Sequence, residues 1–220
     1  VMCIRYHARI AYAHDNECTL LRDPHIARNE EIQLAVYPQV EQMRKHYLGH
    51  LSDIVIIDTH MLAAERLGGA DYDGDMIKTI SDPIINAAVK RNYDLDSLDN
   101  MNNIPLLKIP DVEPLIRNAD DWEARFETVK STFSSRVGQI SNAALDRSII
   151  AYDENSDSAL RKKCREETET LAILTGLEID SAKSGVKPDL TEYLGSGSIS
   201  RSIFLTYKNL VEQSETRRAW

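Results

Sequence analysis

The sequence contains no long run of apolar residues. No segment approaches the roughly 18 consecutive apolar residues of a membrane-spanning helix, so we expect no membrane partner. The first residues also lack the apolar core of a signal peptide, and the chain starts at Val1 rather than at a methionine. We therefore expect the chain to be a fragment of a longer polypeptide.

Cysteine is also scarce, with three residues in 220. Cys3, Cys18 and Cys164 are odd in number and do not have the spacing of metal ligands. Disulfides form in oxidising compartments, whereas unpaired thiols are typical of reducing ones. The cysteine pattern therefore favours reduced thiols and a cytoplasmic location.

Basic residues are fewer than acidic ones: the chain has 26 Lys and Arg against 35 Asp and Glu, and its net charge is −9. Contacts with phosphates need Lys and Arg, so this charge argues against a free-standing nucleic-acid binder. It does not exclude nucleic acid as a substrate. The hydrophobic content of 42% is ordinary for a globular chain, and the length suits one or two domains.

The hydrophobic periodicity changes along the chain and predicts an α+β fold. In the first eighty residues, short alternating or β-branched runs predict strands at 17–22, 31–37, 53–58 and 76–80. Beyond Pro83, spacings of three and four residues predict helices at 83–89, 120–134, 137–151, 156–176 and 199–213, with a loop at 184–198. We accordingly expect two domains, 1–82 and 83–220.

The most informative segment is Asp71-Tyr72-Asp73-Gly74-Asp75. Three alternating carboxylates would lie on one face of an extended strand, and the glycine allows the backbone to bend so that they converge. Converging carboxylates repel one another unless a cation lies between them, and oxygen ligands suit a hard divalent ion. The pattern predicts a catalytic Mg²⁺ site formed by Asp71, Asp73 and Asp75.

Two other interpretations of these acids compete with this one. Asp and Gly are common in solvated surface turns, but here strand-like runs flank the motif on both sides. An EF-hand calcium loop needs Gly at its sixth position and Glu at its twelfth, which are Met76 and Asp82 in this chain. The magnesium interpretation is therefore the one we adopt.

The segment Gly68–Asp75 resembles the metal-binding signature of multisubunit RNA polymerases and their single-chain relatives. Three more segments match the superfamily in the same order. Leu21–Pro24 resembles its Arg-x-Pro element, while Val137–Leu145 and Ile179–Gly185 are similar to two elements of the eukaryotic RNA-dependent, gene-silencing polymerases. The match extends from about residue 20 to 187 and points to the single-chain branch, which also includes phage and bacterial relatives.

This resemblance implies a double-psi β-barrel carrying the catalytic acids in residues 1–82, followed by a mainly helical region, 83–220, with a segment like the bridge helix at 137–151. A second barrel would belong to the remainder of the polymerase chain. The sequence departs from the family at Gly69, where multisubunit enzymes usually carry Asn, and at Ala144, which replaces a histidine of the eukaryotic element. The second departure favours a phage or bacterial origin.

The implied reaction is attack of an RNA 3′-hydroxyl on the α-phosphate of a nucleoside triphosphate (NTP), directed by a DNA or RNA template. The acid triad would hold one Mg²⁺, and a second Mg²⁺ would arrive with the NTP. Arg22 would contact the nucleotide ribose, the alternative being an ion pair with Asp23 or a surface charge. Lys183 would approach the nucleotide phosphates or the RNA–template hybrid, the alternative being an exposed lysine. Helix 137–151 equally suits ordinary core packing.

The main hypothesis is thus an RNA polymerase fragment, a nucleotidyltransferase active in transcription. A competing hypothesis is a non-catalytic module, stabilised by a divalent metal, that serves as a scaffold or binds nucleic acid. A third is a degenerate polymerase relative retained for template binding, against which the intact triad of acids argues.

Overall fold

The computed structural model describes residues 3–5, 17–35, 42, 45–47, 49–50, 55–57, 63–71, 74–92, 106–194 and 207. It has an α+β fold that divides into two compact units, Val1–Lys108 and Ile109–Trp220. Asp73 and the helix expected at 199–213 lie outside the described residues, apart from Tyr207. None of the described helices is long and apolar enough to cross a membrane.

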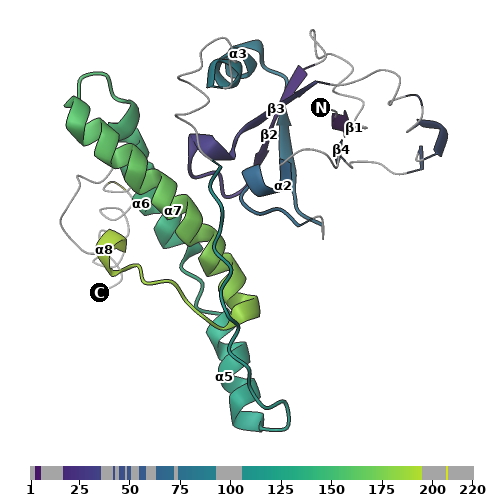
Figure 1. Ribbon diagram of the computed structural model, residues 1–220, viewed down its shortest axis with the longest axis vertical. Coiled ribbons are helices and arrows are strands. Elements are labelled where there is room, and N and C mark those ends of the chain that lie inside the picture. Colours follow the sequence, from purple (N-terminus) through teal and green to yellow (C-terminus); the bar gives the residue numbers. More distant parts are fainter. Residues whose placement is uncertain are drawn as a thin grey trace, which may run out of the picture. The chain divides into compact units, whose positions relative to one another are not determined.

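The first unit contains a three-stranded antiparallel sheet, in the order β3-β2-β5 (Figure 1). The strands are β2 (Glu17–Arg22), β3 (Ile32–Ala35) and β5 (Ile77–Ile80), as alternation predicted. In the β2–β3 register, Cys18 lies opposite Leu34 and Leu20 opposite Ile32. All four are buried on one face because side chains two residues apart on a strand point the same way.

Short elements complete this unit. Strands β1 (Cys3–Arg5) and β4 (Val55–Ile57) form a separate antiparallel pair, and a 3₁₀ helix, η2, spans Arg28–Glu30. Helix α2 (Ala63–Arg66) contributes Ala63, together with the following Leu67, to the core of the sheet. The acid motif lies between Leu67 and β5, so the core anchors both ends of the loop that carries it.

Helix α3 (Pro83–Asn92) packs against β2 and β3. The hydroxyl of Thr19 donates to Oδ1 of Asn86 (2.8 Å), and the side-chain amide of Gln33 donates to the Asn86 carbonyl oxygen (3.2 Å). The compact unit that contains the sheet therefore includes α3 and extends to Lys108.

The second unit is helical and is dominated by two long antiparallel helices, α6 (Val137–Tyr152) and α7 (Ser158–Ser184), which lie side by side in Figure 1. Their contact buries residues at helical spacing, such as Ile140 and Ala144 from α6 and Leu171 and Thr175 from α7. Two shorter helices accompany them, α5 (Trp122–Thr132) and α8 (Thr191–Leu194). The Asp121 carboxylate caps α5 by accepting from the N–H groups of Glu123 and Ala124.

Helix α7 corrects one prediction. We expected it to end before Gly176, but it continues to Ser184 and ends at Gly185, which has a left-handed φ of 74°. Gly176 instead permits a close contact, because a Cβ at this position would lie 2.7 Å from Cγ1 of Ile109. The short helix α8 likewise occupies part of the segment that we expected to be a loop.

Candidate functional site

The backbone before the acids turns through two consecutive left-handed residues. Gly68 has a φ of 68° and Gly69 a φ of 72°. Glycine and asparagine enter this region more readily than other residues. The backbone conformation of position 69 therefore suits either residue, which explains physically how glycine stands where the signature of the multisubunit polymerases has asparagine.

The loop brings Asp71 back to Asp75. The N–H of Asp71 donates to Oδ2 of Asp75 at 3.1 Å, so the first and third acids of the motif are in contact. Gly74 lies inside this loop with a φ of 121°, a conformation that residues with a Cβ rarely adopt. The glycine thus provides the bend that the sequence predicted. Asp73 is outside the described residues.

Arg22 is the second predicted site residue, and it contacts the same loop. It lies at the end of β2 opposite Ile77 of β5, and its Nη2 forms an ion pair with Oδ1 of Asp75 at 2.9 Å. Its Nη1 donates to the Gly68 carbonyl oxygen at 3.2 Å. The predicted alternative partner, Asp23, pairs with Lys78 instead. Arg22 therefore holds both ends of the acid loop and neutralises one of its carboxylates.

Glu30 lies next to Gly68, at the start of the acid loop, and no motif in the sequence pointed to it. Its buried carboxylate accepts from the N–H groups of Ile26 and Ala27, each at 2.9 Å. Its Oε1 would lie 3.0 Å from a Cβ at Gly68, so a side chain at that position, which also has a left-handed φ, would crowd Glu30. Burial raises the pKa of Glu30, although the two backbone hydrogen bonds oppose the rise.

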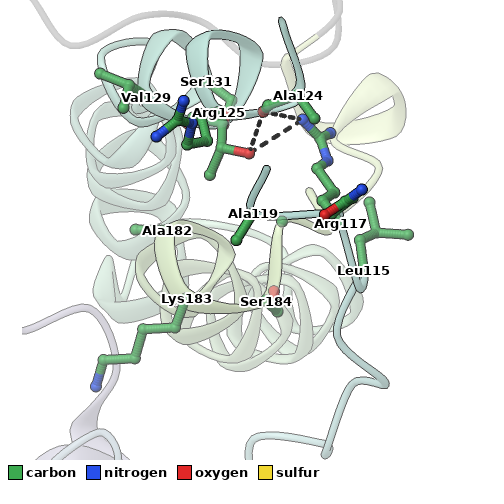
Figure 2. Close-up of a pocket in the computed structure, with 13 residues that line it drawn as sticks. Leu115, Arg117, Ala119, Ala124, Arg125, Val129, Ser131, Ala182, Lys183 and Ser184 are labelled. Carbon is green, nitrogen blue, oxygen red and sulfur yellow. Dashed lines mark hydrogen bonds between the residues drawn. The ribbon is translucent and has the colours of Figure 1, made fainter. Parts of the chain in front are cut away.

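Lys183, the third predicted site residue, lies in the last turn of α7, within the segment Ile179–Gly185. The glycine of this segment is the helix C-cap, and the N–H of Leu115 donates to the carbonyl oxygen of Ser184 at 2.8 Å. Lys183 lines a pocket of about 420 Å³ between the end of α7, the segment around Arg117 and α5 (Figure 2). Its side chain is exposed, and it extends away from Arg117.

The other segment of the resemblance, Val137–Leu145, forms the first half of α6. Ile140 and Ala144 are buried against α7, as core packing of the predicted stripe requires. Ala144 also occupies the position of the histidine in the eukaryotic element. Since this side chain lies in the helix–helix contact, a small residue fits the close packing there.

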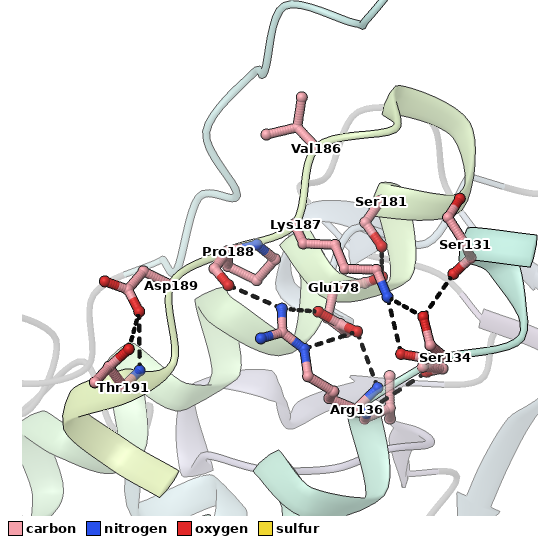
Figure 3. A network of polar contacts seen from close by, with 12 residues as sticks. Ser131, Ser134, Arg136, Glu178, Ser181, Val186, Lys187, Pro188, Asp189 and Thr191 are labelled. Carbon is pink, nitrogen blue, oxygen red and sulfur yellow. Dashed lines mark hydrogen bonds and ion pairs between the residues drawn. The ribbon is translucent and has the colours of Figure 1, made fainter. Parts of the chain in front are cut away.

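A polar network joins the start of α6 to the end of α7 (Figure 3). Glu178 accepts from the backbone N–H of Arg136 at 2.9 Å and from its Nη2 at 2.8 Å, and the same Nη2 donates to the carbonyl oxygen of Pro188. The Glu178 side chain is fully buried. Burial raises its pKa, but the hydrogen bonds and charge of Arg136 outweigh burial and the net pKa is lowered. The pair thus fixes two of the matching segments against each other.

Carboxylate oxygens of the acid loop are suitable ligands for a divalent cation. The two carboxylate oxygens of Asp75 are held by Arg22 and by the N–H of Asp71. Within the described residues, no group of three or more acidic, His or Cys side chains could hold a metal, and the triad needs Asp73, which is outside them.

Comparison with protein families gives a match over almost the whole chain. The model of a family described as RNA dependent RNA polymerase matches residues 6–217. The chain belongs to the RNA-dependent RNA polymerase family. A comparison with curated proteins gave no match.

Membership of the polymerase family confirms the resemblance found in the sequence. The activity of this family is RNA synthesis, a nucleotidyl transfer, and its enzymes generally use divalent metal ions. Two polar residues that organise the matching segments, Glu30 and Arg136, were missed by sequence reasoning. Arg136 directly precedes the segment Val137–Leu145, and this position could have identified it as a candidate. Glu30 belongs to no motif, so nothing in the sequence could have identified it.

Proposed function

We propose that this chain is the catalytic part of a polymerase that transfers a nucleotidyl group from an NTP to an RNA 3′-hydroxyl on a DNA or RNA template, with Asp71, Asp73 and Asp75 as ligands of Mg²⁺. The observation that carries the proposal is the contact between Asp71 and Asp75, since it folds the acid motif back on itself. Membership of the polymerase family supports the same assignment.

In this proposal, the residues of the chain place the reacting groups. Arg22 orients Asp75 and offsets its charge, which reduces the repulsion among three neighbouring carboxylates. Its position beside the acids also suits a contact with the ribose of the nucleotide. Lys183 provides a positive charge for nucleotide or RNA phosphates. Bound Mg²⁺ would lower the pKa of the 3′-hydroxyl and neutralise the leaving pyrophosphate.

We also propose that residues 1–82 belong to a double-psi β-barrel and that residues 83–220 are the adjoining helical region, with 137–151 in the place of a bridge helix. The antiparallel strands β2, β3 and β5 around the acid loop support the first assignment. The bridge-helix assignment is supported by the exposed face of α6, which does not pack against α7 and is therefore available to other parts of the polymerase. The second barrel would come from the remainder of the polymerase chain, in a bacterial or phage-infected cytoplasm.

The test is extension of an RNA primer on matched DNA and RNA templates, by the complete polypeptide of which we propose this chain to be a part. Asp73→Ala should abolish synthesis while the circular dichroism spectrum stays that of the wild type. Asp23→Ala is the matched control, because it removes an exposed carboxylate near the same loop. Synthesis by the Asp73→Ala variant would refute the catalytic assignment.

The competing scaffold hypothesis makes a different prediction in the same experiment. If the acids bind a purely structural ion, Mg²⁺ or Ca²⁺ should raise the melting temperature of the wild type with no dependence on NTP. The ion pair between Arg22 and Asp75 favours this alternative, since it gives one acid a structural role without metal. Loss of RNA synthesis in Asp73→Ala at unchanged melting temperature in Mg²⁺ would exclude it.

A further inference from the structure

The pocket beside Lys183 has a chemical character unlike that of the chain as a whole. It is formed within the second unit by the segment from Leu115 to Ala119, by α5 and by the end of α7. Three cations line it, Arg117, Arg125 and Lys183, and no Asp or Glu is among its lining residues. In a chain with a net charge of −9, such a pocket selects an anionic ligand.

The geometry of α5 keeps its acids away from the pocket. With 100° between successive residues of a helix, Arg125 and Val129 lie on the side that lines the pocket, while Glu123 and Glu127 lie on the opposite side. Glu127 pairs there with Lys130. The two charge signs are therefore separated across one helix, with Arg125 on the side of the pocket.

Both arginines of the pocket have N–H groups that can donate hydrogen bonds to a ligand. Arg117 is fixed through Nη1, which donates to the Thr128 hydroxyl at 3.2 Å (Figure 2). Arg125 makes no side-chain hydrogen bond or ion pair within the described part of the chain, and neither does Nη2 of Arg117. Arginine binds phosphate oxygens well because its donors form a planar fork.

Aromatic side chains occupy the face of α5 next to the one that lines the pocket, and Val129 belongs to both faces. Trp122, Phe126 and Phe133 are 70%, 57% and 84% exposed, and α5 has no buried residue. Together with Val129, which lines the pocket, they follow one face of the helix at spacings of three and four residues. Exposed rings beside cations are the combination with which proteins bind single-stranded nucleic acid, by base stacking and phosphate contacts.

We propose that this pocket and the aromatic face of α5 bind a single strand of RNA, with Arg117 and Arg125 on its phosphates and a base stacked on Trp122. From Trp122 to Phe133 the face is about 16 Å long, at 1.5 Å per residue, and it presents three separate rings. A strand carries several bases that could stack on these rings, whereas a free NTP carries one, so a strand fits the surface better. The inference rests on the proposed function for the choice of RNA and on the pocket for the site.

The first test measures binding of fluorescent oligouridine to the 220-residue chain by anisotropy, in EDTA and at several salt concentrations. The double variant Arg117→Gln/Arg125→Gln should weaken binding and lower the slope of log K against log salt by about 1.4, which is 0.7 for each phosphate that the variant no longer neutralises. Lys162→Gln removes one exposed charge near the start of α7, far along the helix from the pocket at its end, and should leave the slope unchanged. Arg125→Gln alone breaks no contact within the described residues, so a folding defect cannot explain its expected decrease in slope of about 0.7.

The second test uses Trp122 as a reporter. The chain contains two tryptophans, so Trp220→Phe leaves Trp122 as the single one. Oligouridine should quench its fluorescence, and Trp122→Ala should weaken RNA binding about 5- to 150-fold, the range expected for one stacked base.

Several results would overturn the inference. One is an equal decrease in slope for Lys162→Gln. Another is a loss of NTP binding by the double variant Arg117→Gln/Arg125→Gln while its oligouridine binding is unchanged. A third is a dimer of the chain that Trp122→Ala dissociates. The inference and the proposed function fail separately, because RNA binding in EDTA does not need the acids. Asp73→Ala should bind oligouridine like the wild type, and the pocket variants test the RNA site whatever the outcome of primer extension.

Discussion

Replacement of Arg136 by alanine should cost this protein a large part of its stability. The variant removes the partner of Glu178, whose side chain is fully buried. The backbone N–H of residue 136 still donates to Glu178, but the variant has neither the positive charge nor the Nη2 hydrogen bond. The carbonyl oxygen of Pro188 is also deprived of its donor.

The magnitude follows from the burial of the two partners. Removal of one partner from a buried ion pair costs about 3–5 kcal/mol, since the other charge is left without compensation. Arg136 is 29% exposed, so water can reach the vacated space and we expect the lower end, about 3 kcal/mol. Lys162→Ala is the matched control on α7, because its pair with Glu166 is 80% and 66% exposed and should contribute less than about 0.5 kcal/mol.

The assay is urea unfolding of the chain, followed by circular dichroism of the helices at pH 7. Arg136→Ala should lower the midpoint strongly and Lys162→Ala hardly at all. Equal midpoints for the two variants would contradict the argument that burial makes the pair strong.

The effect also has a defined pH dependence. Arg136 lowers the folded-state pKa of Glu178 below its usual value of 4.5, despite burial. A lowered pKa means that the pair stabilises the protein fully above pH 4.5 and that this contribution disappears as the pH falls through the folded-state pKa. In the variant, burial without Arg136 raises the pKa of Glu178, so the difference between wild type and Arg136→Ala should be largest near pH 7 and shrink as the pH falls. A difference that grows on acidification would mean that the assigned sign is wrong.

Two glycine substitutions give further predictions. Gly176→Ala should destabilise the second unit by about 1–3 kcal/mol in the same assay, because its Cβ would collide with Ile109, whereas Gly138→Ala has open space and should be neutral or stabilising by up to about 1 kcal/mol. Gly69→Asn should preserve RNA synthesis in the primer-extension assay and Gly69→Val should reduce it, since asparagine tolerates a φ of 72° and a β-branched residue does not. Equal activity of the two Gly69 variants would show that the backbone conformation there is unimportant.

The pattern of residues predicted much of the secondary structure because local spacing controls it. The alternation of Ile32 and Leu34 identified β3, and the Asp-Asp pair before Trp122 identified the start of α5. Gly176 was misinterpreted for a physical reason. A glycine in a helical pattern is equally consistent with a helix end and with a close contact, and the residue that decides, Ile109, is distant in the sequence.

For the candidate site too, the sequence identified some of the residues but not the contacts between them. The acids and Arg22 were found from their residue types and order, but their pairing was not, since Arg22 and Asp75 are 53 residues apart. Arg22 was expected to contact the ribose or Asp23, and in the folded chain it holds Asp75. The role of Glu30 was hidden because it arises from burial beneath Gly68.

The amino-acid sequence by itself determined the polymerase family, the acid motif with its bend at Gly74, and the change from strands to helices, because these depend on residue type and on neighbours within a few positions. Only the tertiary structure decided that Arg22 neutralises Asp75 and that Arg136 compensates the charge of Glu178. Those pairs depend on the packing of segments that are 53 and 42 residues apart, and burial, which no local pattern records, determines their strength.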